Sequence, residues 1–145
     1  MKKIVFHEEY CMGCHLCEVH CIVQHSKYDD IVKAFKKETP SLVSRVTIEE
    51  DKPTFLSVKC QHCNEPVCTY YCITGALHKE PGSGVIMLDE EKCIGCWTCL
   101  LACPFGAVNR DENRKKAVKC DLCNGDETPA CVLHCPNEAL ECIQS

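Results

Sequence analysis

Seventeen cysteines in a chain of 145 residues constrain its fold more than any other feature. Sixteen of them form four blocks, each of which opens with Cys-x-x-Cys and closes with Cys-x-x-x-Cys. In chain order the blocks are Cys11, Cys14, Cys17 and Cys21; Cys60, Cys63, Cys68 and Cys72; Cys93, Cys96, Cys99 and Cys103; and Cys120, Cys123, Cys131 and Cys135. Blocks two, three and four also share the sequence pattern that follows their last cysteine, so the chain contains an internal repeat.

Apart from cysteine, the chain has little material for a hydrophobic core. Aromatic residues make up only 6% of it, and burial alone is not expected to offset the entropy of ordering such a chain. Bound metal is the expected source of the remaining stability. The net charge of -5 argues against nucleic-acid binding, which needs a basic surface.

The sequence also predicts a compartment. No apolar run reaches the length of about 18 residues that a membrane span needs, and Met1 to Phe6 does not have the pattern of a secretory signal. We therefore expect a chain without a membrane span that works in the reducing cytoplasm.

The spacing within a block indicates iron–sulfur chemistry. Cys-x-x-Cys-x-x-Cys places three thiolates on one tight loop, from which they converge on a single cube, and we expect the fourth cysteine to begin a short helix and point away. Block three, with Pro104 after Cys103, matches the pattern of bacterial two-cluster ferredoxins at every specified position. Blocks one and two have Ile22 and Ile73 in place of this proline, and blocks two and four have longer internal gaps.

Three rival chemistries compete with clusters for the cysteines. A disulfide framework needs an oxidising compartment and leaves one of 17 thiols unpaired. Zinc ribbons use paired Cys-x-x-Cys units but have no use for the regular third and fourth cysteines. Thioredoxin-like chemistry needs one such pair on a βαβ scaffold, which this sequence does not indicate. The pattern favours clusters, with structural zinc as the main rival.

These blocks resemble the polyferredoxin-like electron-transfer subunits with four 4Fe-4S clusters, found beside dimethyl sulfoxide reductase, formate dehydrogenase, formate hydrogenlyase and hydrogenase catalytic subunits. The segment from Cys11 to Cys21, followed by His25 and Ser26, is most similar to the iron–sulfur subunits of carbon monoxide dehydrogenase and tungsten aldehyde oxidoreductase. The resemblance implies that block one pairs with block four and block two with block three. It implies four ligand sets: Cys11, Cys14, Cys17 and Cys135; Cys120, Cys123, Cys131 and Cys21; Cys60, Cys63, Cys68 and Cys103; Cys93, Cys96, Cys99 and Cys72.

We expect an α+β fold of two pseudo-symmetric lobes, each like a bacterial 2×(4Fe-4S) ferredoxin, with short helices, β-hairpins and much irregular loop. The outer lobe comprises residues 1–21 and 104–145, the inner lobe residues 60–103, and residues 22–59 are an insertion. Apolar runs predict strands at 4–6 and 139–143 and hairpins within 77–88 and 107–119. In the insertion they predict a helix near 31–35 and a hairpin within 46–58.

The sequence has no dinucleotide loop, nucleophile elbow or zinc-protease motif, and a cube with four cysteine ligands has no open position. The resemblance therefore implies a non-catalytic chain that relays single electrons. One partner would be a catalytic subunit: carbon monoxide dehydrogenase, a tungsten or molybdenum aldehyde or formate oxidoreductase, or hydrogenase. The other would be a ferredoxin or an NAD(P)H-linked flavoprotein. The alternatives are a freely diffusing ferredoxin and a zinc-stabilised interaction module without a redox role.

A few further residues have two interpretations. His20, His62 and His134 either donate hydrogen bonds to cluster sulfur or simply pack, and packing is favoured. Trp97 is expected to shield a cube from water, and Cys142 to be a buried apolar residue on a strand. The basic turn of Arg110, Arg114, Lys115 and Lys116 is expected to be solvated, or else to bind an acidic partner. Residues 22–59 are the best candidate for partner contact.

Overall fold

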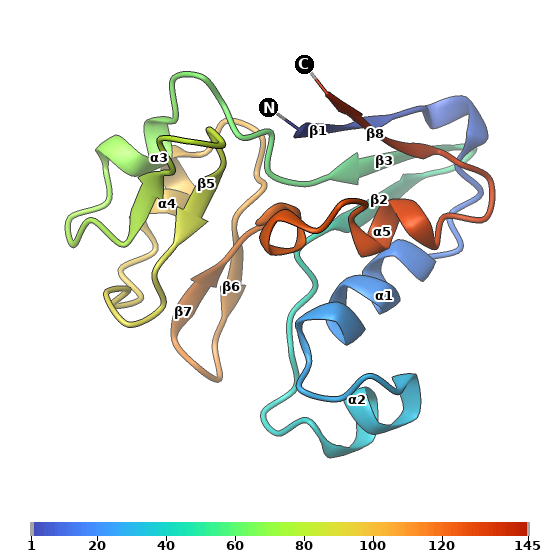
Figure 1. The fold of residues 1–145 in the computed structure, drawn as a ribbon, viewed down its shortest axis with the longest axis horizontal. Coiled ribbons are helices and arrows are strands. Elements are labelled where there is room, and N and C mark those ends of the chain that lie inside the picture. The colour runs from blue at the N-terminus through green and yellow to red at the C-terminus, as the bar shows by residue number, and fades with distance from the viewer. Residues whose placement is uncertain (1, 145) are drawn as a thin grey trace.

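The computed structural model describes residues 2–144 and shows an α+β fold of short helices and two-stranded sheets (Figure 1). The strands are β1 (Lys2–Phe6), β2 (Thr47–Asp51), β3 (Thr54–Val58), β4 (Leu77–Lys79), β5 (Ile86–Leu88), β6 (Asn109–Asp111), β7 (Lys116–Val118) and β8 (Leu140–Gln144). The α-helices are α1 (Leu16–His25), α2 (Ile31–Lys37), α3 (Val67–Tyr70), α4 (Thr98–Ala102) and α5 (Ala130–Leu133). Two 3₁₀ helices cover Glu8–Tyr10 and Leu122–Gly125. Within residues 2–144, no helix is long and apolar enough to cross a bilayer.

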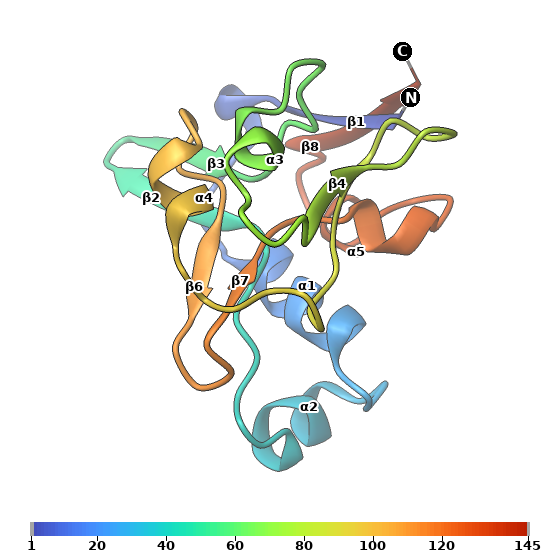
Figure 2. The same cartoon turned by 90° about the vertical axis from the view of Figure 1, so that its left-hand side faces the viewer.

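All the sheets are antiparallel pairs. β2–β3, β4–β5 and β6–β7 are hairpins, whereas β1 pairs with β8 and holds the two ends of the chain side by side (Figures 1 and 2). The predicted terminal strands and the hairpins within 77–88 and 46–58 are confirmed. The third hairpin is also confirmed, but its first strand begins at Asn109, two residues later than predicted, after Ala107 and Val108, which are buried in the core.

One prediction about the helices is wrong. In every block it is the third cysteine, and not the fourth, that lies at the start of a helix, as its second residue: Cys17 in α1, Cys68 in α3, Cys99 in α4 and Cys131 in α5. The fourth cysteine lies four residues later, which is about one helical turn. The helix begins as soon as the Cys-x-x-Cys loop is complete, and the spacing of four then spans that first turn.

The sequence repeat is also a repeat of backbone conformation. The second residue after the first cysteine of each block has a positive φ: 69° at Gly13, 47° at His62, 73° at Gly95 and 55° at Leu122. The third residue after the last cysteine also has a positive φ in blocks two to four: 70° at Gly75, 61° at Gly106 and 55° at Glu138. These shared left-handed turns show that the four blocks fold their loops alike.

Buried side chains form two hydrophobic clusters, and cysteines belong to both. The first contains Ile4, Val46, Ile48, Leu122 and Leu140 together with Cys17, Cys21, Cys120 and Cys131. The second contains Leu77, Ile86, Val108 and Ala117 together with Cys99. Segment 104–145 contributes to both hydrophobic clusters, because Val108 and Ala117, at the β6–β7 hairpin, pack in the second cluster.

The segment predicted as an insertion, residues 22–59, is partly integrated into the core. The β2–β3 hairpin packs Ile48 and Phe55 onto the first cluster. Asp30 caps α2 by accepting a hydrogen bond from the backbone N–H of Lys33 at 3.0 Å. Both ribbon views show α2 far from the β1–β8 pair, so this helix is the part of the segment that extends from the body (Figures 1 and 2).

Candidate metal centres

Three cavities are each lined by four cysteines that come from two blocks. One has Cys11, Cys14, Cys17 and Cys135; the next has Cys60, Cys63, Cys68 and Cys103; the third has Cys93, Cys96, Cys99 and Cys72. Each cavity therefore combines the first three cysteines of one block with the last cysteine of another. The fold brings together the members of three of the four sets that the resemblance implied.

The cavity walls other than sulfur are largely apolar. Phe6, Met12, Ile48 and Leu140 line the first cavity, and Pro66, Val67, Ile86 and Val108 line the second; Leu77, Leu88, Ile94 and Trp97 line the third. Their empty volumes, with the open mouths included, are about 360, 450 and 330 Å³. Similar linings and sizes indicate three equivalent sites, each with largely apolar walls around the sulfurs.

The fourth set comes from α1 and block four. Cys21, Cys120, Cys123 and Cys131 are all buried, and α1 packs against α5. Burial raises the pKa of the Cys131 thiol, and the neighbouring sulfurs of Cys120, Cys21 and Cys123 raise it further. These four sulfurs are therefore within electrostatic reach of one another.

The thiols of the core resist ionisation in the protein alone. Burial raises the pKa of Cys17 and of Cys120 to about 12, and that of Cys99 and of Cys123 to about 11. Thiolates are the form that binds metal, so sulfurs in these positions require nearby cations. Within residues 2–144, no group of three or more His, Cys, Asp or Glu side chains is arranged to hold a single metal ion. Sets of four cysteines around a cavity instead fit the iron ions of a 4Fe-4S cluster.

Backbone N–H groups are directed at the fourth cysteine in three blocks. Arg45 donates to Cys21 Sγ at 3.3 Å, Leu77 to Cys72 Sγ at 3.5 Å, and Ala139 to Cys135 Sγ at 3.2 Å. Leu77 and Ala139 belong to the repeated tails, so the left-handed turn after each of these two blocks places an N–H against sulfur. Hydrogen bonds of this kind stabilise a sulfur ligand and tune the potential of its cluster.

His62 leaves a buried ring nitrogen without a protein partner. Its Nδ1 accepts the backbone N–H of Ile86 at 3.0 Å, so Nε2 carries the proton, and no residue of the described chain accepts it. Burial lowers the pKa of His62 to about 3, which keeps the ring neutral. A buried donor left unsatisfied costs about 1–3 kcal/mol. A cluster held by the loop from Cys60 to Cys63 would bring sulfur atoms, which can accept hydrogen bonds, into the neighbourhood of His62.

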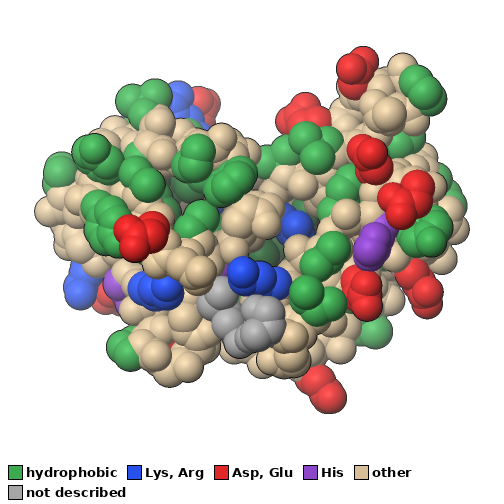
Figure 3. Space-filling model, turned by 90° about the horizontal axis from the view of Figure 1, so that it is seen from above, with side chains coloured by type: hydrophobic (Ala, Val, Ile, Leu, Met, Phe, Trp, Pro, Cys, Tyr) green, Lys and Arg blue, Asp and Glu red, His purple; other side chains and the backbone are tan. Residues whose placement is uncertain are grey.

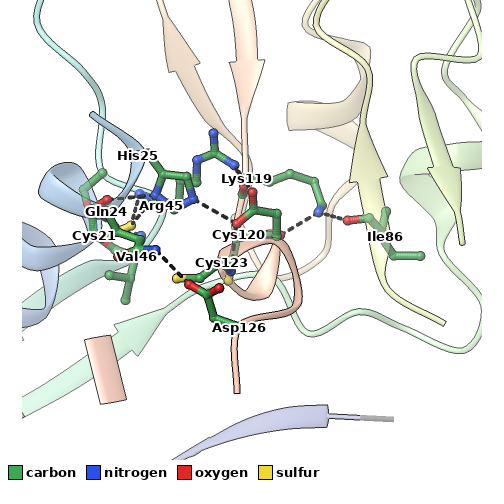
Figure 4. A network of polar contacts seen from close by, with 12 residues as sticks. Cys21, Gln24, His25, Arg45, Val46, Ile86, Lys119, Cys120, Cys123 and Asp126 are labelled. Carbon is green, nitrogen blue, oxygen red and sulfur yellow. Dashed lines mark hydrogen bonds and ion pairs between the residues drawn. The ribbon is translucent and has the colours of Figure 1, made fainter. Parts of the chain in front are cut away.

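A polar network ties Cys21 to block four (Figure 4). The carboxylate of Asp121 accepts hydrogen bonds from His25 Nε2 at 3.0 Å and from Arg45 Nη1 at 2.7 Å. His25 Nδ1 donates to the carbonyl of Cys21 at 2.8 Å. Burial acts to lower the pKa of His25, but the hydrogen bonds to Asp121 and Cys21 outweigh it and raise this pKa to about 9. Both ring nitrogens therefore carry protons.

Two buried lysines that sequence reasoning missed lie next to these cysteines. Lys59 is 3% exposed and Lys119 is 2% exposed. Each precedes the first cysteine of its block in the sequence Val-Lys-Cys, and this repeat was a signal that could have revealed them. Lys119 Nζ donates to the carbonyls of Ile86 and Cys120 (Figure 4).

The remaining residues noted in the sequence mostly have packing roles. The rings of His20 and His134 stack with centroids 3.6 Å apart, and the Arg110 guanidinium lies 4.5 Å from the centroid of the Trp97 ring. Cys142 lies on a strand as expected, opposite Ile4 in the β1–β8 pair, but it is half-buried, because this side of the ribbon is partly open to solvent.

The expectation of a solvated basic turn is confirmed for Arg110 and Lys115, which are exposed, but not for Arg114 and Lys116, which contact the body of the protein. Arg114 donates to Asp111 Oδ2 and to the carbonyl of Pro40, both at 3.2 Å. Lys116 Nζ donates to the carbonyl of Cys93. These contacts hold the β6–β7 hairpin against the third cysteine block.

Comparison with known proteins agrees with this sulfur-rich donor set. The model of the 4Fe-4S dicluster domain matches residues 52–144. An iron-sulfur protein of Rhodospirillum rubrum is 35% identical, over 93% of this chain and 78% of its own. The electron transport protein HydN of Escherichia coli K12 is 32% identical, over 98% of this chain and 87% of its own. A sulfite dehydrogenase subunit of Allochromatium vinosum is 33% identical, over 89% of this chain and 62% of its own.

A solved structure shows the same fold. A chain of the active-site complex BamBC of benzoyl-coenzyme A reductase matches with a TM-score of 0.54 and 23% identity, over 99% of this chain and 76% of that chain. The fold, the cysteine sets and the sequence relatives thus agree. The chain belongs to the 4Fe-4S dicluster domain family and is an iron–sulfur electron-transfer protein.

Proposed function

We propose that this chain is a non-catalytic subunit that carries four 4Fe-4S clusters and relays single electrons between a catalytic redox subunit and a second carrier. The observation that carries the proposal is the crossing of blocks in three cavities, each with three cysteines from one block and the last from another. This exchange of the fourth ligand is typical of interlocked two-cluster motifs. A protein that held four separate metal ions would not need it.

In this proposal the cysteines of each cavity hold one cluster, and Cys21, Cys120, Cys123 and Cys131 hold the fourth. We also propose two ferredoxin-like lobes, the outer from residues 1–21 and 104–145 and the inner from 60–103, with 22–59 inserted. The packing of α1 against α5 and of α3 against α4 supports this division. The β6–β7 hairpin reaches from the outer segment to the inner cluster.

The cysteine groups follow an order through the molecule. A 4Fe-4S cluster exchanges one electron at a time. Cys60 packs against the hydrophobic cluster that contains Cys120 and Cys131, so the second cavity and the fourth set adjoin at the centre. Cys14 and Cys96 belong to the two outlying groups and are the exposed cysteines of the described chain. We propose that electrons enter and leave near these two residues.

A large apolar surface supports attachment to another subunit. Exposed side chains around α3 and α4 are Leu101 at 90%, Ile73 at 73%, Tyr70 at 67%, Tyr71 at 59% and Phe105 at 52%. Figure 3 shows hydrophobic side chains on both halves of the molecule, while most of the acidic side chains in this view lie on the right, away from this left-hand part. Apolar patches of this kind mark protein contacts, which favours a bound subunit over a freely diffusing ferredoxin.

The proposed occupant of this surface is a catalytic redox subunit, since one relative is a subunit of a sulfite dehydrogenase. By resemblance of the Cys11–Cys21 segment, that partner is carbon monoxide dehydrogenase, a tungsten or molybdenum aldehyde or formate oxidoreductase, or hydrogenase. The second carrier is a ferredoxin or an NAD(P)H-linked flavoprotein. Purification from the native host, with identification of the companions, tests these identities.

The cluster assignment is tested by anaerobic purification and metal analysis. We expect about sixteen irons and equal sulfide per chain, four of each per cluster, and paramagnetic signals after reduction by dithionite. Cys131→Ser should lose one cluster, whereas Cys142→Ser should keep all four. A colourless protein with about four zinc ions would identify the zinc-stabilised module instead.

The docking surface is tested with Leu101→Asp, which places a charge on the most exposed apolar residue of the patch. We expect the variant to keep the iron content of the parent and to lose the catalytic subunit during purification. If the parent itself migrates as a monomer after gentle anaerobic purification, the protein is a diffusing ferredoxin.

A further inference from the structure

Lys119 lies at the boundary between the two central cysteine groups. Its side chain forms part of the wall of the cavity that contains Cys60, Cys63, Cys68 and Cys103. Its Nζ atom donates to the carbonyl of Cys120 at 2.7 Å, and Cys120 belongs to the neighbouring set. Figure 4 shows the same side chain extending from the block-four loop towards Ile86 on β5. One buried ammonium thus touches both groups.

Lys59 occupies the corresponding position in block two, immediately before Cys60. Lys59 is 3% exposed, and the sulfurs of Cys120, Cys131 and Cys60 lie within electrostatic reach of its ammonium group. Two of these sulfurs belong to the neighbouring set and one to its own block. Lys119 likewise lies within electrostatic reach of Cys60 in one group and of Cys120 in the other.

A buried ammonium is costly unless an anion compensates it. The anionic groups that act on Lys59 are cysteine sulfurs. Within residues 2–144, neither lysine forms an ion pair with a carboxylate, while Arg45 and Arg114 both do. The compensating negative charge is therefore expected from the sulfur ligands and what they bind. A 4Fe-4S cluster becomes more negative by one charge on reduction, so a fixed cation beside it favours the reduced state.

We propose that the ammonium groups of Lys59 and Lys119 form a cationic layer between the two central cysteine groups and favour the reduced state of the clusters held there. The inference rests on the proposed function and assigns a role to two residues that bind no iron. Its consequence is that electrons reside preferentially at the centre of the path, between the exposed ends at Cys14 and Cys96.

The test is a potentiometric titration of the anaerobically purified protein, followed by electron paramagnetic resonance. Lys119→Met removes the charge and keeps the length of the side chain. We expect it to shift the reduction equilibrium of one or two clusters about tenfold towards the oxidised form, which is about 59 mV for a one-electron step. Lys59→Met should lower the potentials of the same clusters. Iron and sulfide contents should match the parent.

Lys92 offers a matched control, because it also directly precedes a cysteine, Cys93, but its side chain is 62% exposed. Lys92→Met should leave every midpoint potential unchanged, since solvent screens its charge. Lys119→Arg retains the positive charge and should keep the parental potentials. If Lys119→Met fails to assemble, Lys59→Met and Lys119→Arg decide the question.

Two results would overturn the inference. One is unchanged potentials in the methionine variants with full iron loading. The second is an equal fall of the same potentials in Lys119→Arg, which would assign Lys119 a structural role through its bonds to Ile86 and Cys120. Both leave the proposed function intact, whereas a parent protein without reducible clusters would refute that function itself.

Discussion

Replacing Asp121 with asparagine is expected to destabilise the protein by about 3 kcal/mol, although the side chain keeps its shape. Asp121 is only 8% exposed and joins segments far apart in the sequence. Its carboxylate binds protonated His25 at the end of α1 and Arg45 in the following segment. Through these two residues it holds Cys21 beside block four.

The magnitude follows from the bonds that change. Two charge-assisted hydrogen bonds, each worth about 1.5–3 kcal/mol, become bonds to a neutral amide, and two partly buried cations lose their counter-charge. Removing one partner of a buried ion pair costs about 3–5 kcal/mol. Asparagine still offers an oxygen to the backbone N–H of Cys123, which Asp121 binds at 3.0 Å, so the low end of that range applies.

Anaerobic urea unfolding, followed by circular dichroism and by the visible absorbance of the clusters, measures this effect. With a urea dependence of about 2 kcal/mol per M, the midpoint should fall by about 1.5 M. The control is Glu112→Gln, which removes an exposed partner of Arg110, has a side-chain exposure of 77%, and should cost less than about 0.5 kcal/mol. Equal midpoints for the two variants would refute the argument from burial.

Four further variants test individual features. Gly95→Ala should destabilise the protein by about 2–4 kcal/mol in the same assay, because Gly95 has φ 73° and a Cβ there would lie 2.4 Å from the carbonyl oxygen of Lys115. Gly106 also has a positive φ, but a Cβ there would meet open space, so Gly106→Ala should cost only about 1–2 kcal/mol. Glu138→Gly should raise stability by up to about 1 kcal/mol, since it relieves a left-handed non-glycine residue, and an unchanged or lower midpoint would contradict this. Cys142→Ser should retain full iron content by metal analysis, and loss of a cluster would show that this cysteine is a ligand.

The local architecture could be predicted because its determinants are local. Cys-x-x-Cys loops, the repeated tails and the terminal strands are encoded within a few residues, and the structure shows them at the expected places. The start of each helix was mispredicted, since the spacing of four between the last two cysteines fits a helix that begins at either one. The residue before each helix marks the start: it is left-handed in blocks one and three, at His15 and Trp97, and it is a proline with negative φ in blocks two and four, at Pro66 and Pro129.

The surroundings of the sulfurs could not be predicted, because they depend on contacts between distant segments. His25 and Asp121 are 96 residues apart, and Lys119 binds a carbonyl 33 residues away. A lysine is ordinarily a surface residue, so Lys59 and Lys119 carried no signal beyond the repeated Val-Lys-Cys. The contacts of Arg114 and Lys116 in the basic turn could not be predicted for the same reason, since their partners Pro40 and Cys93 lie outside the turn.

The distribution of cysteines between distant blocks also bears on how the protein assembles. The cavities of blocks two and three draw all their cysteines from residues 60–103, whereas the first cavity needs Cys135 together with Cys11. Six of the buried core residues are themselves cysteines: Cys17, Cys21, Cys99, Cys120, Cys123 and Cys131. Metal binding and folding are therefore coupled, because burying these thiols is favourable only when they also bind metal cations. In the proposed assignment, the inner pair of sites has all its sulfurs once the chain has been made as far as Cys103, while the outer pair must wait for the C-terminal block and for the pairing of β1 with β8.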